Sequence, residues 1–136
     1  LNQLRQLGWN NPPVELLVLS AWRTAVGDED AELGFAGLAV QAGVKSAVAS
    51  LWYVSDEATL GLMSEFYRQL KVAPIKSEAL RDAQLAMIKG EVRIVGGQLQ
   101  ESGENLPLPP ELVKLGDTSL EHPYYWAAFT MIGSPW

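Results

Sequence analysis

The strongest constraint on the fold is an apolar segment at residues 14–20 (Val-Glu-Leu-Leu-Val-Leu-Ser), directly after an Asn-Asn-Pro-Pro turn cluster at 10–13. Its hydrophobic residues run almost without alternation, which indicates a strand buried on both faces, as in a parallel sheet covered by helices. Open α/β sheets place their crevice at the carboxyl end of such strands. Trp22 follows at that point, so an indole occupies a position where a nucleophile would be expected.

The segments after this strand predict an α/β unit. Residues 33–42 form a helix of small side chains stopped by Gly43, and residues 46–52 form a second strand. A right-handed crossover and a parallel strand pair are expected from this order. Ser55 is expected to cap the next helix, whose first-turn acids Asp56 and Glu57 suit the helix dipole. Ser77 is expected to cap a further helix at 78–89.

The last third of the chain predicts less regular structure. Residues 92–100 form a hairpin around Gly96-Gly97, since paired glycines suit primed two-residue turns. Residues 101–110 are a polar, proline-rich excursion, and residues 124–132 predict an aromatic strand ending at Gly133.

Composition limits the classes of partner and compartment. The net charge is −6 with scattered basic residues, which argues against nucleic acid as a partner. No apolar run reaches the ~20 residues of a transmembrane helix and no signal-peptide pattern is present, so a cytoplasmic protein without a membrane partner is expected. The chain has no cysteine, which excludes disulfides and thiolate metal sites, and no cofactor is expected.

The amino-terminal residues predict a chain that is the later part of a longer domain. Leu1, Leu4 and Leu7 follow a helical stripe that Gly8 ends, and no methionine precedes them. We therefore expect a sheet that is incomplete at its N-terminal side. An exposed strand edge favours self-association, so a homo-oligomer is expected.

Five short motifs occur in a fixed order along the chain: LSAWRTA (19–25), GFAGL (34–38), ASLWYVSDEA (49–58), ALRDAQ (79–84) and HPYYWAAF (122–129). This succession resembles the CHAT domain, a bacterial relative of the caspases and separase. The resemblance covers essentially the whole chain and matches the later part of that domain. Residues 1–136 are therefore expected to form the C-terminal part of a single CHAT-like domain, with a polar excursion at about 90–121.

The resemblance implies a caspase-like three-layer α/β sandwich with a mostly parallel sheet. In active members it implies a cysteine peptidase with a Cys–His dyad. The cysteine of that dyad falls on Trp22, and the histidine would lie before Leu1. A cysteine peptidase requires a thiolate activated by a neighbouring base, so no catalytic residue is expected to be intact in this chain.

Three functions follow as hypotheses. The first is a catalytically inactive CHAT-type domain that acts as a protein- or peptide-binding or regulatory module. The alternative is a cysteine endopeptidase that cleaves after a basic residue, whose parent form has cysteine at position 22 and an upstream histidine. A small-molecule-binding doubly wound domain is a third hypothesis, but the chain lacks a phosphate-binding glycine fingerprint.

Two interpretations remain open at the predicted crevice. Trp22 either fills a crevice that no longer performs catalysis or provides a stacking platform for a ligand, because exposed tryptophans are favoured binding anchors. Ser20 and Thr24 flank it as substitute nucleophiles, but only His122 is available as a base. Ser20 is expected to bond backbone at the strand end, and His122 to support the turn before Pro123.

A substrate pocket is the other site that the resemblance implies. An acid in the family's Leu-Trp-x-Val-x-Asp motif lines the pocket for a basic side chain, and Asp56 matches that acid. With Trp52 and Ser20, it forms the candidate pocket. The structural interpretation is that Asp56 only complements the dipole of its helix and that Trp52 belongs to the core. The acids at 28–32 lack the spacing of a calcium loop, so no metal site is expected.

Overall fold

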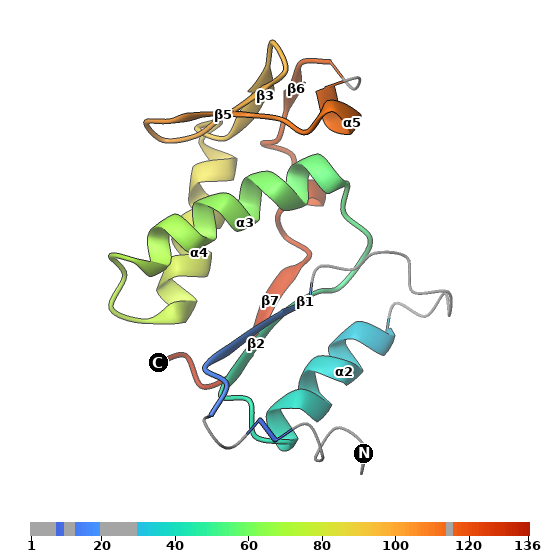
Figure 1. Ribbon diagram of the computed structural model, residues 1–136, viewed down its shortest axis with the longest axis vertical. Helices are drawn as coiled ribbons and strands as arrows, with labels where there is room; N and C mark the ends of the chain where they lie inside the picture. Colours follow the sequence, from blue (N-terminus) through green and yellow to red (C-terminus); the bar gives the residue numbers. More distant parts are fainter. Residues whose placement is uncertain (1–7, 10–12, 20–29, 114–115) are drawn as a thin grey trace. The chain divides into compact units, whose positions relative to one another are not determined.

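A computed structural model of the chain describes residues 8–9, 13–19, 30–113 and 116–136. They belong to two units, Leu1–Tyr53 with Ala128–Trp136, and Val54–Ala127 (Figure 1). Each unit contains one sheet with at least one helix, which confirms the predicted α/β class. No helix within the described ranges is long and apolar enough to cross a membrane.

The sheet of the first unit has the order β1-β2-β7, formed by Leu16–Leu19, Ser46–Ser50 and Phe129–Gly133. Strands β1 and β2 are parallel, with Leu16 opposite Ser46, and this pair was predicted. Strand β7 is antiparallel to β2. The described sheet is therefore mixed, whereas a mostly parallel sheet was expected.

Helix α2 (Asp30–Gln41) connects the two parallel strands and packs on their sheet. Ala36 of the helix and Ala47 and Ala49 of β2 are fully buried, and these small side chains allow close approach of helix and sheet. All five residues of β2 are buried, but the four residues of β1 are only half-buried. The prediction of burial on both faces was therefore wrong in part for β1, because β1 is an outer strand of the described order, whereas β2 lies between two neighbours.

The last strand begins later than predicted. Pro123–Tyr125 is a 3₁₀ helix, and only Phe129–Gly133 forms β7. Proline fixes its backbone angle and lacks an N–H, which favours a helical first turn over a strand. The strand ends at Gly133, which has a positive φ of 97° and packs against the Lys45 carbonyl so closely that a Cβ would overlap it.

The second unit is built on two packed helices, α3 (Asp56–Leu70) and α4 (Lys76–Ile88). The predicted Ser55 cap of α3 is confirmed, because its Oγ accepts a hydrogen bond of 3.4 Å from the Ala58 amide. The predicted Ser77 cap of α4 was wrong. Ile75, after Pro74, has an extended backbone and serves as the N-cap residue, so the helix begins before Ser77.

Four short strands complete the second unit in the order β5-β4-β3-β6, all antiparallel. Their bounds are Arg93–Val95 (β3), Gln98–Gln100 (β4), Asn105–Pro107 (β5) and Thr118–Ser119 (β6), and the one-turn helix α5 is Pro110–Val113. The predicted hairpin is confirmed, with positive φ at both Gly96 and Gly97. The excursion at 101–110 was not expected to contain a strand, yet it holds β5.

Gly61 lies in the middle of α3 at a point of close packing. It is buried, and a Cβ added there would lie 2.9 Å from Cγ1 of Val92 and 3.3 Å from Cδ1 of Leu120. Both neighbours are fully buried. The glycine therefore allows the residues directly before β3 and directly after β6 to pack closely on the helix.

Candidate functional site

The carboxyl ends of the parallel strands lie side by side, as the predicted crevice requires. Leu19 at the end of β1 is opposite Ala49, and Ser50 at the end of β2 is opposite Phe129 of β7. The Leu51 amide continues the ladder by donating to the Ala128 carbonyl at 2.8 Å. Open α/β sheets bind ligands at this kind of edge.

The nucleophile position follows this edge in the chain. Trp22 comes three residues after Leu19, and it lies outside the described residues, as do Ser20 and Thr24. The predictions for these residues, and for the acids at 28–29, therefore stay predictions. The described residues contain no group of three or more His, Asp or Glu side chains that could hold a metal ion.

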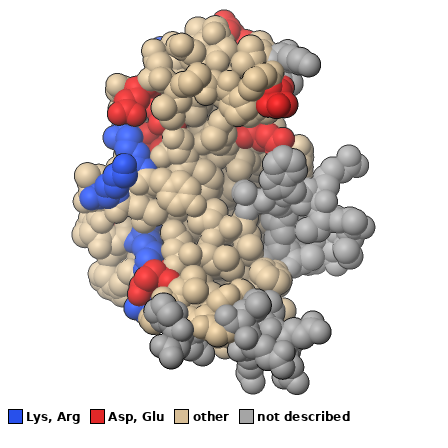
Figure 2. All heavy atoms as spheres, viewed as in Figure 1, with Lys and Arg blue, Asp and Glu red and all other residues tan. Residues whose placement is uncertain are grey.

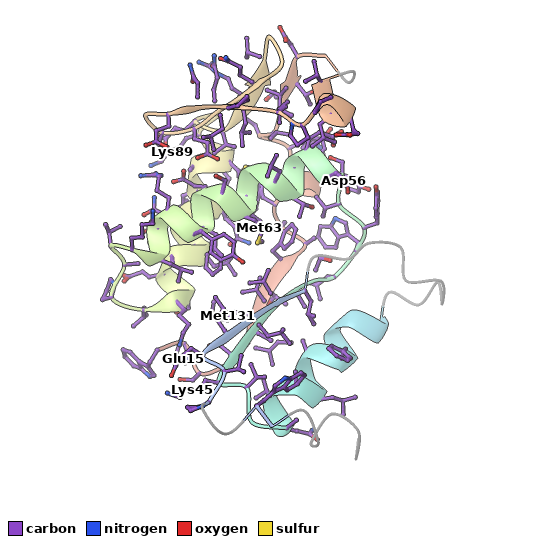
Figure 3. The ribbon with its side chains drawn as sticks, viewed as in Figure 1. Glu15, Lys45, Asp56, Met63, Lys89 and Met131 are labelled. Carbon is purple, nitrogen blue, oxygen red and sulfur yellow. The ribbon has the colours of Figure 1, made fainter. Side chains whose placement is uncertain are left out.

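Trp52 and Asp56, the other predicted pocket residues, are both described. Trp52 follows β2 by two residues and is half-buried. Asp56 is exposed at the N-terminal end of α3 (Figure 3), and Glu57 beside it is half-buried. Trp52 belongs to the first unit and Asp56 to the second, so a shared pocket stays a prediction. The position of Asp56 suits the helix dipole, the structural interpretation of this residue.

His122 has a structural role, as predicted. Its Nδ1 accepts a hydrogen bond of 3.2 Å from the Tyr124 amide and so caps the 3₁₀ helix that Pro123 begins. Its ring meets the Tyr125 ring edge-on at 6.5 Å between centroids. These residues line an open hollow of about 770 Å³ together with Ser119 and Glu121.

A charged cluster on α3 is a feature that the sequence analysis missed. Glu65 is fully buried and accepts hydrogen bonds from Nε of Arg68 at 3.0 Å, from Nη2 of Arg68, and from the Gln69 side-chain amide at 2.8 Å. The hydrogen bonds to Glu65 raise the pKa of Arg68, which fixes its positive charge. Because these residues are three and four apart on a helix, their spacing is a signal that sequence analysis could have used.

A second carboxylate, far away in the sequence, joins this cluster. Glu101 follows β4 and is only 9% exposed, and burial is the main cause that raises its pKa. It borders a hollow of about 290 Å³ that α3 and the β4–β5 connection line with Ser64, Tyr67, Arg68, Lys71, Glu101, Glu104 and Leu106. No local sequence pattern predicts the burial of Glu101 at this hollow, because a turn brings the residue to helix α3.

Comparison with family models identifies the chain. The fold is a mixed α/β arrangement with a parallel strand pair at a candidate crevice. The model of the CHAT domain matches residues 1–134, so the chain belongs to the CHAT domain family, as its motifs predicted. This family is related to the caspase-like peptidases. Comparisons with curated proteins and with solved structures find no match.

Proposed function

We propose that this chain is a catalytically inactive CHAT domain that acts as a protein- or peptide-binding or regulatory module. One observation carries the proposal: a chain matched by the family over residues 1–134 contains no cysteine. Cysteine peptidases act through a thiolate, and no other residue type in the chain supplies one. The proposal includes the caspase-like three-layer sandwich that the family implies.

A binding role is supported by what the chain keeps. The parallel β1–β2 pair ends at one edge, which is the place where ligands bind in open α/β sheets. The family's nucleophile position carries a tryptophan, and tryptophan is enriched among residues that dominate binding energy. A module that retains the crevice and has an indole in place of the thiol would hold a peptide without cutting it.

The test uses a blocked, fluorescently labelled peptide that contains one Lys or Arg. We expect the full chain to bind it, measured by fluorescence anisotropy, and mass spectrometry to find the peptide intact. Trp22→Ala should weaken binding. Cleavage by the unmodified chain, or absence of binding to it, would refute the proposal.

Restoring the thiol separates the module from a recently lost peptidase. Trp22→Cys, made in the full-length protein, is challenged with the same peptide. Continued inactivity favours the module, whereas cleavage that the tryptophan form does not perform favours the peptidase as the ancestral function.

The role of Asp56 is tested against its neighbour. If Asp56 lines a pocket for a basic side chain, Asp56→Asn weakens binding of the Lys or Arg peptide and Glu57→Gln does not. If both acids only complement the helix dipole, the two variants leave binding unchanged and each lowers the free energy of unfolding by about 0.3–1 kcal/mol.

A further inference from the structure

The hollow beside the C-terminal half of α3 is lined by residues of the second unit, whereas the strand ends at the crevice of the proposed function belong to the first. Figure 2 shows acidic and basic side chains next to one another over the region where α3 and the β4–β5 hairpin lie in Figure 1. The hollow measures about 290 Å³. A water molecule takes up about 30 Å³ of liquid, so the hollow has room for a group the size of a side chain.

Glu101 borders this hollow with an oxygen that lacks a partner. The residue is 9% exposed, and its Oε1 is buried and has no hydrogen-bond partner among the described residues. The Ser64 hydroxyl hydrogen bonds the same carboxyl group, which still leaves Oε1 unsatisfied. Buried polar atoms in native proteins are nearly always satisfied, so an orphaned carboxyl oxygen indicates a missing donor.

The nearby basic groups do not supply this donor. Arg68 attracts Glu101 and Glu104, but its Nε and Nη2 donate to Glu65. Lys71, also at the hollow, is exposed. Glu65, Glu101 and Glu104 in their charged forms carry three negative charges against the two positive charges of Arg68 and Lys71. One negative charge is therefore left for a cation from outside.

The backbone holds the two carboxylate-bearing residues together. The Glu101 amide donates to the Glu104 carbonyl at 2.9 Å, and the Gly103 amide donates to the Glu101 carbonyl at 2.6 Å. Gly103 has a φ of 109°, a conformation that side-chain-bearing residues rarely adopt. This tight turn keeps Glu101 and Glu104 on the same hollow. Tyr67, which is 49% exposed, adds an aromatic ring to its lining.

We propose that this hollow binds an organic cation, a guanidinium or a primary ammonium group, with Glu101 and Glu104 as its carboxylate partners and the Tyr67 ring beside it. Such groups donate several hydrogen bonds to carboxylates and are attracted to aromatic faces. The site does not depend on the crevice at the ends of β1 and β2. It binds its cation whether or not that crevice holds a peptide.

The test is an NMR titration of the full, isotope-labelled chain with three probes. A blocked Gly-Arg-Gly tripeptide represents a side chain of a partner protein, spermidine represents a free amine, and a blocked Gly-Gln-Gly tripeptide is the uncharged control. We expect a cationic probe to shift the amide resonances around Glu101 and Tyr67, and the control to leave them unchanged. Saturation by the tripeptide alone identifies a protein partner, and saturation by spermidine alone identifies a free amine.

Matched variants decide whether the carboxylates hold the cation. Glu101→Gln and Glu104→Gln should each weaken binding about tenfold, the range expected for a charged hydrogen bond. Glu111→Gln removes the same charge from α5, outside the hollow, and should leave binding unchanged. Lys71→Gln should tighten binding by removing a competing positive charge.

Three results would overturn the proposal: no shift with either cation, shifts of equal size with the glutamine control, or equal weakening in the Glu111→Gln variant. Circular dichroism checks the fold of each variant. If Glu101→Gln fails to fold, the Glu104→Gln variant decides, since Glu104 is exposed and its loss leaves no buried group unpaired. Trp22→Ala, the variant that tests the proposed function, should not change cation binding in this hollow, so failure of one proposal can be distinguished from failure of the other.

Discussion

At the scale of single residues, Glu65 is a side chain on which the stability of the fold depends strongly. Its carboxylate is fully buried and depends on donors from Arg68 and Gln69. A buried charge that loses a partner retains the cost of its desolvation without compensation. The ion pair is therefore a requirement of folding and not a source of surplus stability.

We predict that Arg68→Ala lowers the free energy of unfolding by about 2 kcal/mol or more, because it leaves Glu65 buried with fewer donors. The control is Arg81→Ala, which breaks an exposed pair with Asp82 at 3.3 Å. That variant should change stability by less than about 0.5 kcal/mol. Urea denaturation followed by circular dichroism measures both. Equal effects of the two substitutions would show that the Glu65 pair has no special role.

A second prediction concerns Glu101, whose contribution to the free energy of unfolding depends on pH. Burial raises its pKa in the folded chain above the ordinary value of 4.5, so the folded state binds its proton more tightly than the unfolded state. Stability from this group is present below pH 4.5 and is lost as the pH rises through the folded-state pKa.

Glu101→Gln should therefore be more stable than the natural chain at neutral pH, and the difference should shrink as the pH falls through the folded-state pKa and should be lost below pH 4.5. Urea titrations from about pH 8 to about pH 4 measure it. Glu111→Gln, an exposed substitution of the same kind, should show no such trend. If the stability difference between Glu101→Gln and the natural chain grew toward acid pH, this result would contradict a raised pKa of Glu101 in the folded chain.

The residues of the candidate site differ in how far the sequence predicts them. Asp56 and His122 could be placed from sequence, because an acid in the first helical turn after a serine cap and an X-Pro turn are local patterns. Glu101 could not, since its burial depends on a turn that packs against α3. Its chemistry comes from tertiary structure and leaves no periodic signal.

At the scale of elements, α3 depends on a glycine in its interior. Gly61→Ala adds a methyl group 2.9 Å from Val92, and overpacking of this kind costs about 1–3 kcal/mol. The better helix propensity of alanine offsets up to about 1 kcal/mol of this cost. We predict a net loss of about 1 kcal/mol in the free energy of unfolding.

Gly34→Ala in α2 is the matched control, because no described atom other than those of its chain neighbours and of its own helix backbone lies within 4 Å of the position of its added Cβ. This substitution should stabilise the chain by about 0.5–1 kcal/mol through reduced backbone entropy of the unfolded state. Thermal and urea unfolding measure both variants. A stabilising Gly61→Ala would show that α3 can move away from the strands without cost.

The elements were predicted to different extents for physical reasons. Strand β2 and helix α3 follow strong hydrophobic patterns and lie where expected, and the Gly96-Gly97 turn identifies its hairpin. Strand β5 was missed because Asn105–Pro107 is exposed throughout and so has no alternation of apolar and polar residues. Its pairing with β4 is a tertiary property.

At the scale of the whole molecule, we expect self-association. Strand β1 is one of the two outer strands in the described order of its sheet, and the edge of an outer strand can offer hydrogen-bonding groups to a second copy. Sedimentation velocity at several concentrations should show a dimer or larger species. The net charge of −6 opposes non-specific aggregation near neutral pH, so a discrete oligomer would indicate a defined interface.

A charge placed on the edge tests the interface. Val18→Lys in β1 should shift the equilibrium toward monomer, because lysine on an edge strand opposes pairing. Asn105→Lys in β5, an outer strand of the other sheet, should leave this equilibrium unchanged. A monodisperse monomer of the natural chain, or equal effects of both substitutions, would contradict association through β1.

The pairing of β2 with β7 has a consequence for how this protein can be taken apart. The chain leaves the first unit after Tyr53 and returns at Ala128, and the ladder continues to the Leu51–Ala128 hydrogen bond at this junction. The two ends of the stretch Val54–Ala127 are thus fastened at neighbouring points. Because its two ends lie close together, this stretch should be replaceable by a tight turn or by a reporter domain. The pairing of β2 with β7 should stay intact after such a replacement.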